Sequence, residues 1–361
     1  MIPYKGEKLN KRIQRIGLVT AGGDCPGLNA VIRAVTKTAH NDYGVEVFGV
    51  RDGFVGMVTY KGVDRGKVLT NRDASGILAS GGTILGTARG DVFQAAGKEE
   101  GEYSIFEDAF SELKLDALIC TGGEGTQLMA HKLYTHGFPV VGVPKTIDND
   151  VMHTDVTFGF DSAVSIIMKA IDNLHSTAMS HHRVLVVEVM GRSAGWLALA
   201  GGVAGGGDIL LLPEIPYEEE VIFKRVWDRS KQGKRFSIVV VAEGVKPQEG
   251  DVEKREIARY ISTLIQRETK IESRPVILGH LQRGGPPTAY DRILATQFAV
   301  MAVDLVMKGR FGQMAAIQGN QFTSVPVSEV IKKVKRVPQD HSLIRAALSV
   351  GTSFGSAKFD S

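Results

Sequence analysis

The chain has 361 residues, a formal net charge of +3, 43% hydrophobic residues and 23% charged residues. These values are ordinary for a globular protein, and the length suffices for two domains or one large α/β unit. The charge is too small to indicate a nucleic-acid-binding protein. The basic excess fits either a solvated surface or a pocket for an acidic substrate.

Signals of export and of membrane insertion are missing from the sequence. Cys25 and Cys120 lie far apart without metal-ligand spacing, so we expect no disulfide framework and a reducing compartment. The first fifteen residues are charged and lack the apolar run of a signal peptide. No stretch approaches the roughly 18 apolar residues that a membrane span needs. We therefore expect a soluble, cytoplasmic protein.

Short apolar runs recur along the chain, and helical patterns separate several of them. Continuous Val/Ile/Leu runs are typical of buried parallel strands. The predicted strands are Ile16–Thr20, Val45–Val50, Ala117–Thr121, Val140–Pro144, Val184–Val189, Ile209–Pro213, Ile238–Ala242 and Val276–Gly279. The predicted helices are Ala30–His40, Thr126–His136, Glu218–Gln232, Lys254–Glu268 and Asp291–Lys308. This alternation favours an α/β protein whose parallel sheets are covered by helices.

Two of the turns that follow predicted strands resemble each other. Val19–Asp24 and Cys120–Glu124 each contain an apolar strand end, a Thr, a Gly pair and an acidic residue, and a helix follows each. A Gly-rich turn at a helix start presents backbone N–H groups to an anion. The alternative is that such glycines only relieve backbone strain. The sequence has no P-loop motif, and no dinucleotide-binding GxGxxG with a downstream acid follows a strand.

The segment Pro144–Asp150, PKTIDND, comes directly after the apolar run at 140–143. Two carboxylates two residues apart, Asp148 and Asp150, suit a division of labour in which one removes a proton and the other positions substrate or assists a divalent cation. A helix-capping Asx turn would use the same residue types. The local sequence leaves both interpretations open.

Four basic groups stand beside strand ends, where we expect Gly-rich turns rather than helix faces. They centre on Arg183, Arg192, Arg274 and Arg283. The planar guanidinium group matches a phosphate bidentately, so arginines in these places favour a phosphorylated ligand. Ordinary surface salt bridges are the alternative.

Together these motifs resemble the phosphofructokinase family, in its bacterial type. The motifs are GGDCPGLN, TARG, TGGEGT, PKTIDND, HHRVLVVEVMGR, AEG and LGHLQRGGPPTAYDR, in the family's order, over about residues 13 to 335. The resemblance implies two Rossmann-like, three-layer αβα domains with mainly parallel sheets and an active site in the cleft between them. It implies a phosphoryl-donor domain at 13–159 plus 282–332, and a fructose 6-phosphate domain at 160–281 plus 333–361.

The resemblance also implies residue roles. Asp148 would take the proton from the sugar 1-hydroxyl, with Thr146 and Asp150 in the same loop. Arg192 and the backbone of Gly23 would stabilise charge on the transferred phosphoryl group. The sugar phosphate would contact Thr146, Asp148, Asp150, Met190, Gly191, Arg192, Glu243, His280 and Arg283, with Arg183 and Arg274 reaching it from a neighbouring subunit. The donor would contact Gly23, Arg89, Gly122, Glu124, Gly125, Thr126 and Lys145.

Further implications concern metal, assembly and regulation. Glu124 stands where the family has an aspartate near Mg²⁺, and shared sites imply a homotetramer, or at least a homodimer. An allosteric enzyme is implied, and Arg33, Lys234 and Asp208 fit the family's effector site. Other expected basic positions are Asn71, His175 and Gln232 here. Fewer cations imply weaker anion binding, so effector control is absent or different.

The phosphoryl donor is the point on which the motifs disagree. Gly125 is typical of ATP users, because a side chain there would exclude the nucleotide's α-phosphate, whereas Lys145 is typical of pyrophosphate users. The direct exclusion of the α-phosphate by a side chain at position 125 is the stronger argument. We therefore expect ATP as the donor, with a pyrophosphate-dependent phosphotransferase as the alternative. NAD and lipid kinases share the G-G-x-G-T turn but lack PKTIDND and GHLQRGG. A non-catalytic, sugar-phosphate-binding regulatory subunit would be expected to lose the acid pair or the arginines, which this chain keeps.

Overall fold

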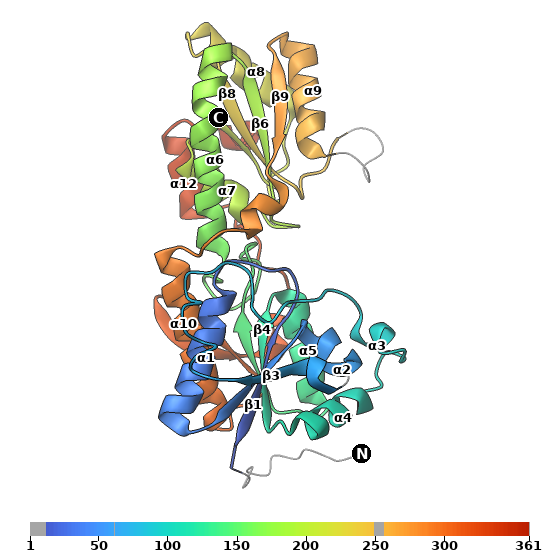
Figure 1. The fold of residues 1–361 in the computed structure, drawn as a ribbon. Helices are drawn as coiled ribbons and strands as arrows, with labels where there is room; N and C mark the ends of the chain where they lie inside the picture. Colours follow the sequence, from blue (N-terminus) through green and yellow to red (C-terminus); the bar gives the residue numbers. More distant parts are fainter. Residues whose placement is uncertain (1–11, 61, 249–255, 361) are drawn as a thin grey trace. The chain divides into compact units, whose positions relative to one another are not determined.

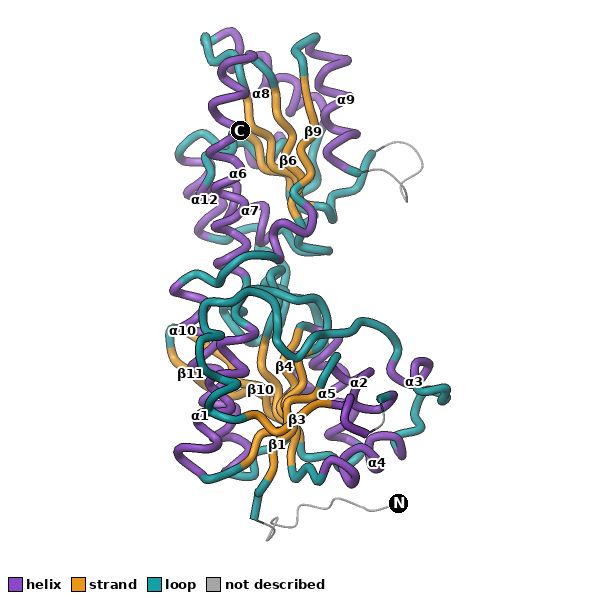
Figure 2. Tube along the Cα trace, viewed as in Figure 1, coloured by secondary structure: helices purple, strands orange, loops and turns teal. Residues whose placement is uncertain are grey.

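The computed structural model describes residues 12–60, 62–248 and 256–360, and the chain folds as two units (Figure 1). Unit 1 comprises residues 1–146, 151–159 and 283–334, and unit 2 comprises residues 147–150, 160–282 and 335–361. Each unit is built around its own sheet, which helices cover on both faces (Figure 2). The predicted α/β class with mainly parallel sheets in two domains is confirmed.

Unit 1 contains a seven-stranded sheet in the order β11-β10-β5-β4-β1-β2-β3. All neighbours pair in parallel except β2–β3 and β10–β11, which are antiparallel. The strands are β1 (Arg15–Thr20), β2 (Glu46–Val50), β3 (Gly66–Leu69), β4 (Ala117–Gly122), β5 (Val140–Pro144), β10 (Gln313–Gln318) and β11 (Gln321–Pro326). The central strand β4 is buried along its whole length, which is why its sequence is a continuous apolar run.

Two groups of helices cover this sheet. Helices α1 (Leu28–Tyr43) and α10 (Ala289–Met307) pack together on one face (Figure 1). On the other face lie α2 (Gly53–Thr59), α3 (Val92–Ala95), α4 (Ser104–Leu113) and α5 (Glu124–Thr135). Helix α11 (Val327–Val330) packs against α5. An aromatic cluster around the fully buried Phe106 fills the space under α2 and α4.

Unit 2 contains a four-stranded, fully parallel sheet in the order β7-β8-β6-β9. Its strands are β6 (Val184–Val189), β7 (Ile209–Leu211), β8 (Ser237–Ala242) and β9 (Ser273–Ile277). One face carries α6 (Phe160–His181), α7 (Trp196–Ala204) and α12 (Ser342–Ser349), and the other carries α8 (Glu219–Lys231) and α9 (Ile257–Thr269). Three short helices complete the fold: η1 (Gly62–Arg65) in unit 1, α13 (Ala357–Asp360) in unit 2, and η2 (Gly279–Arg283), whose last residue belongs to unit 1.

Some predicted boundaries were wrong. The last predicted strand, Val276–Gly279, is shifted: β9 covers Ser273–Ile277, and Gly279 opens η2. The strand predicted at Ile209–Pro213 ends at Leu211. Of the helix predicted at Lys254–Glu268, the first two residues lie outside the described part of the chain, and α9 begins at Ile257. Among the described residues, no helix combines the length and the apolar character needed to cross a membrane.

Candidate functional site

The two look-alike turns lie next to each other in unit 1. Strands β1 and β4 are adjacent and parallel, with Thr20 paired to Thr121, so the turns that follow them emerge at the same sheet edge. Gly22 has φ +82°, a left-handed conformation that glycine adopts without strain. The turns lead into helices α1 and α5, whose N-cap positions are Gly27 and Gly123. Both turns therefore direct helix N-termini toward one edge, as anion sites do.

Three side chains bind consecutive carbonyl groups of the first turn. The Thr87 hydroxyl donates to the Gly22 carbonyl (2.6 Å), and the Lys145 ammonium donates to the Gly23 carbonyl. The Arg283 guanidinium donates to the Asp24 carbonyl (3.1 Å). Thr87 did not emerge from the sequence analysis as a site residue. Its only signal was its place in the TARG motif beside Arg89.

Gly23 lies between two guanidinium groups. A Cβ atom added at Gly23 would overlap the terminal nitrogens of Arg89 and of Arg283, so a side chain there would displace these guanidinium groups. Arg89 is exposed, whereas Arg283 is only 8% exposed and its Nε atom has no hydrogen-bond partner within the described chain. The structure thus brings the predicted residues Gly23, Arg89 and Arg283 together.

The second Gly-rich turn contains both a crowded glycine, Gly122, and an open one, Gly125. Gly122 is confined, because a Cβ there would overlap the Thr126 side chain, but a Cβ at Gly125 would meet nothing within 4 Å. Gly125 is exposed, Thr126 is buried, and Glu124 is the half-buried first residue of α5. The Gly122 carbonyl accepts hydrogen bonds from the Lys145 backbone N–H (3.1 Å) and from the Gln127 side chain (3.0 Å).

The PKTIDND loop passes from unit 1 to unit 2 between Thr146 and Ile147. Lys145, Thr146, Asp148 and Asp150 are all buried, and the Thr157 hydroxyl binds the Thr146 carbonyl (2.8 Å). A helix-capping role for the two acids finds no support, since no helix begins in this loop and α6 starts ten residues after Asp150.

Lys335 holds the unit 2 part of this loop. Its ammonium donates to the Asn149 side-chain oxygen (2.9 Å) and its backbone N–H donates to the Asp150 carbonyl (2.8 Å). Trp196 in turn donates its indole N–H to the Lys335 carbonyl (3.0 Å). Asn149 has φ +51°, a left-handed conformation that asparagine adopts more readily than most other non-glycine residues. Sequence reasoning missed Lys335, because it lies far along the chain and in no motif.

The carboxyl edge of the unit 2 sheet gathers a second set of predicted residues. Met190, Gly191 and Arg192 follow β6, and Glu243 follows β8. Arg192 has φ +53°, and its backbone N–H donates to the Glu243 carboxylate (2.7 Å). Strained backbone held by a neighbouring side chain is common where geometry serves binding or catalysis.

The turn that carries His280 is tied to the same place. Gln282, which is fully buried, accepts a hydrogen bond from the Met190 backbone N–H (3.2 Å) and donates one to the Gly279 carbonyl (3.1 Å). Gln282 thereby joins η2 to the loop after β6. It lies inside the LQRGG motif, but its role in positioning was not predicted.

Arg183 and Arg274 lie at the opposite, amino edge of this sheet. Arg183 immediately precedes β6 and Arg274 is the second residue of β9, which pairs in parallel with β6. The five steps from Val184 to Val189 separate the two edges by about 17 Å. The prediction that all four basic groups stand beside Gly-rich turns is therefore wrong for these two arginines. Gly-rich turns follow parallel strands, and these residues come at the strand starts.

Glu272 forms ion pairs with both arginines. Its carboxylate pairs with Arg183 (2.7 Å) and with Arg274 (2.5 Å). The hydrogen bond from Arg183 and the nearby positive charges lower the pKa of Glu272. Sequence reasoning also missed this residue, since a single Glu beside a strand carries no motif.

The residues predicted for an effector site fall in both units. Arg33 lies on α1 of unit 1. In unit 2, Asp208 pairs with Arg229 (2.7 Å) and accepts the backbone N–H of Ile238 (2.9 Å), and burial raises the pKa of Asp208. His175 bonds to the Gly205 carbonyl (2.8 Å). Asp208 therefore has a structural partner of its own.

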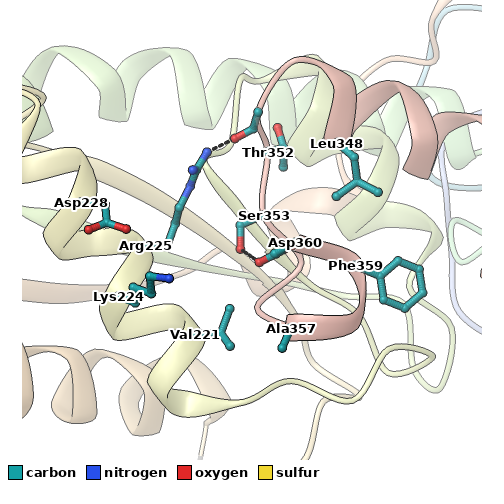
Figure 3. A pocket seen from close by; sticks show the side chains of 11 residues that line it. Val221, Lys224, Arg225, Asp228, Leu348, Thr352, Ser353, Ala357, Phe359 and Asp360 are labelled. Carbon is teal, nitrogen blue, oxygen red and sulfur yellow. Dashed lines mark hydrogen bonds between the residues drawn. The ribbon is translucent and has the colours of Figure 1, made fainter.

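A pocket of about 490 Å³ lies elsewhere in unit 2, between α8 and the C-terminal segment (Figure 3). None of its lining residues belongs to the predicted sites. Its polar groups are partly engaged, since Arg225 donates to the Gly351 carbonyl and Ser353 to the Asp360 carboxylate, as Figure 3 shows.

No cluster of three or more His, Cys, Asp or Glu side chains within residues 12–60, 62–248 and 256–360 could hold a metal by itself. Mg²⁺ is commonly bound by one or two carboxylates together with substrate phosphates. A single carboxylate in the first turn of a helix that follows a Gly-rich turn, as Glu124 offers, fits that chemistry. Cys25 and Cys120 are both buried and free, and burial raises the pKa of Cys25 to about 12.

Known proteins resemble this chain in sequence and in fold. The ATP-dependent 6-phosphofructokinase 3 of Bacteroides thetaiotaomicron is 48% identical over 94% of this chain and 100% of its own length. The ATP-dependent 6-phosphofructokinase of Spirochaeta thermophila is 47% identical over 94% of this chain and 97% of its own length. The solved phosphofructokinase of Saccharomyces cerevisiae superposes with a TM-score of 0.78 at 31% identity, covering 94% of this chain and 46% of the yeast chain. The phosphofructokinase family model matches residues 15–306, and the chain belongs to the phosphofructokinase family.

Proposed function

We propose that this protein transfers the terminal phosphoryl group of ATP to the 1-hydroxyl of fructose 6-phosphate, giving fructose 1,6-bisphosphate and ADP in glycolysis. The observation that carries the proposal is the near full-length similarity to ATP-dependent 6-phosphofructokinases. The open surroundings of Gly125 support ATP as the donor, because nothing in the described chain fills the space beside its Cα atom.

The proposal assigns each ligand to one unit. The donor binds unit 1 through Gly23, Arg89, Gly122, Glu124, Gly125 and Thr126, with Lys145 beside them in the same site, and the sugar phosphate binds mainly residues of unit 2. These are Asp148, Asp150, Arg183, Met190, Gly191, Arg192, Glu243, Arg274 and His280, joined by Thr146 and Arg283 from unit 1. The domain bounds we propose are 13–159 plus 282–332 for the donor and 160–281 plus 333–361 for fructose 6-phosphate, and they differ from the two units at residues 147–150, 282 and 333–334.

In the proposed reaction Asp148 accepts the proton of the 1-hydroxyl while that oxygen forms its bond to the γ-phosphorus of ATP. The bond between the γ-phosphorus and the bridging oxygen breaks, and its electron pair leaves with ADP. The guanidinium of Arg192 and the backbone N–H of Gly23 stabilise the negative charge on the transferred group. Positioning and electrostatics dominate such a reaction, because the protein forms no covalent bond to the phosphoryl group.

Mg²⁺ would neutralise charge on the donor phosphates, with Glu124 as the carboxylate that holds it. The active assembly in this proposal is a cytoplasmic homotetramer. The separation of Arg183 and Arg274 from Arg192 across the sheet supports sites shared between subunits, because one substrate molecule on one chain cannot reach both edges.

A coupled assay with fructose 6-phosphate and either ATP or pyrophosphate tests this function. We expect activity with ATP, and we expect Asp148→Asn to lower kcat by about 10²–10⁴, as losing a general base does, with little change in sugar-phosphate binding. Glu107→Gln, which removes an exposed carboxylate on α4, is the control for loss of one negative charge. Preference for pyrophosphate would show that the alternative donor is the correct one. Absence of activity with both donors would favour a regulatory subunit that binds sugar phosphate.

A further inference from the structure

Lys145 contacts both Gly-rich turns of unit 1. Its ammonium binds the Gly23 carbonyl of the first turn, and its backbone N–H binds the Gly122 carbonyl of the second turn (3.1 Å). Lys145 is only 3% exposed. Burying an ammonium group is unfavourable unless it is well hydrogen-bonded, and the Gly23 carbonyl supplies one such bond to the Lys145 ammonium.

Thr87 binds the same turn one peptide earlier. Its hydroxyl donates to the Gly22 carbonyl at 2.6 Å, and Thr87 is half-buried. The donors from Thr87 and Lys145 therefore hold two consecutive peptide groups of the turn, Gly22–Gly23 and Gly23–Asp24.

The orientation of these peptides has a direct consequence. In a trans peptide the carbonyl and the N–H of the next residue point in opposite directions. Fixing the Gly22 and Gly23 carbonyls toward Thr87 and Lys145 directs the N–H groups of Gly23 and Asp24 away from them. Successive N–H groups held in this way form a concave site for an anion, and Gly22 at φ +82° supplies the left-handed residue of such a site.

We propose that Lys145 and Thr87 are positioning residues that fix the Gly22–Asp24 turn for the donor phosphates. This inference rests on the proposed function. In this inference Lys145 acts on the donor by orienting the N–H groups of the turn. That effect is the same whether the donor is a nucleotide or pyrophosphate. It also removes the disagreement between Gly125 and Lys145, because only Gly125 then discriminates between donors.

The test is a double-mutant cycle on kcat/KM with ATP, using Lys145→Met, Thr87→Val and the double variant. Lys145→Met should lower kcat/KM about tenfold to hundredfold and Thr87→Val about threefold to tenfold, as expected for charged and neutral hydrogen bonds. Both act on one turn, so the double variant should lose clearly less than the product of the single losses. The KM for fructose 6-phosphate should stay unchanged.

Conservative variants and a matched control complete the design. Lys145→Arg and Thr87→Ser keep a donor and should recover part of the activity. Thr59→Val removes a hydroxyl that binds the Val55 carbonyl (2.6 Å) on α2, and it should behave as wild type. Where the wild type also turns over pyrophosphate, the same cycle is measured with it, and the positioning role requires equal fold-losses with the two donors.

Two results would overturn the inference. One is a Thr87→Val enzyme with wild-type kinetics beside a Lys145→Met enzyme whose KM for ATP alone rises, which indicates direct contact between Lys145 and the donor. The other is strictly multiplicative losses in the double variant. If the wild type uses only pyrophosphate, the proposed donor is wrong, but the cycle measured with pyrophosphate still decides the role of the two residues.

Discussion

Three glycines of the proposed donor site differ in the space around them. A Cβ atom at Gly122 would overlap the Thr126 side chain and one at Gly23 would displace the ends of Arg89 and Arg283, whereas Gly125 has open space around it. A substitution at Gly125 should therefore leave the ligand-free fold intact. Its effect should fall on the ligand alone, which makes this position the cleanest probe of donor choice.

Gly125→Asp should raise the KM for ATP about tenfold or more. A carboxylate a few ångströms from a phosphate is repelled by about 1–4 kcal/mol at effective dielectric constants of 80 to 20, and each 1.4 kcal/mol is a factor of ten. Steady-state kinetics with ATP and with pyrophosphate measures the effect. Gly125→Ala adds a methyl group without charge and controls for bulk. An unchanged KM for ATP in the Asp variant would contradict the role given to Gly125.

The sequence brings forward individual candidate residues where they lie inside contiguous motifs, as Gly23, Lys145 and Arg192 do. Their supports could not be predicted in the same way. Lys335 holds Asn149 from a position 186 residues away, and Glu272 and Gln282 act through contacts that only the folded sheet creates. Pairing across such distances depends on topology, which local sequence does not encode.

At the scale of elements, β6 and α9 are joined by a carboxylate. Glu188 on β6 accepts the backbone N–H of Ala258 in the first turn of α9 (3.0 Å). A carboxylate at this place satisfies one of the N–H groups that a helix start leaves unpaired. Burial raises the pKa of Glu188, and the charges of Glu256 and Glu243 act in the same direction, while Arg259 opposes them.

The stability contributed at Glu188 should fall as the pH rises. Because the folded-state pKa is raised above the ordinary value of 4.5, the folded protein holds this proton over a pH window where the unfolded chain has lost it. The free energy of unfolding therefore decreases as pH increases through that window. Glu188→Gln keeps an acceptor without ionising, so its stability relative to wild type should improve from pH 4.5 upward.

Chemical denaturation at several pH values between 4.5 and 8 measures this difference. Glu220→Gln, an exposed carboxylate in the first turn of α8, controls for the loss of one negative charge. A difference between Glu188→Gln and wild type that stays constant with pH would rule out the raised pKa.

Elements with a uniform pattern were predictable, and elements that depend on pairing were not. Strands β4, β5 and β8 are buried on both faces, so their apolar runs identified them. The hairpin β10–β11 and the antiparallel edge strand β3 were missed, since these strands mix polar and apolar residues. Helix α6, with 22 residues, was missed because its buried positions are sparse and no strong start signal precedes it.

At the scale of the whole molecule, the residues proposed to bind the sugar phosphate lie at two opposite edges of the unit 2 sheet. Assembly of subunits would bring the two sets into one site. Arg192 and Glu243 lie at one edge and Arg183 and Arg274 at the other. A symmetric oligomer can place the amino edge of one subunit against the carboxyl edge of the next site, so that each site contains both sets.

Mixed oligomers test this arrangement. Asp148→Asn and Arg274→Ala chains should each be inactive alone, and random hybrids should regain activity in about one quarter of their sites, where both contributed residues are intact. Co-expression with two affinity tags isolates the hybrids, and native mass spectrometry confirms their composition.

Hybrids of Asp148→Asn with Arg192→Ala provide a matched control. Both of those residues come from the same chain in the proposed site, so regained activity should not exceed background. Inactive Asp148→Asn/Arg274→Ala hybrids would argue that each subunit forms its site alone.

Glu272 acts as a built-in counter-ion for Arg183 and Arg274. In the proposed function, a sugar phosphate that reaches these arginines would compete with a carboxylate that is already in place, and it would exchange one anion for another. A phosphate monoester carries about −1.5 to −2 charge at pH 7 against −1 for a carboxylate. The exchange would therefore favour binding of doubly charged ligands over singly charged ones. In this way Glu272 would make the affinity of the arginine pair depend on ligand charge.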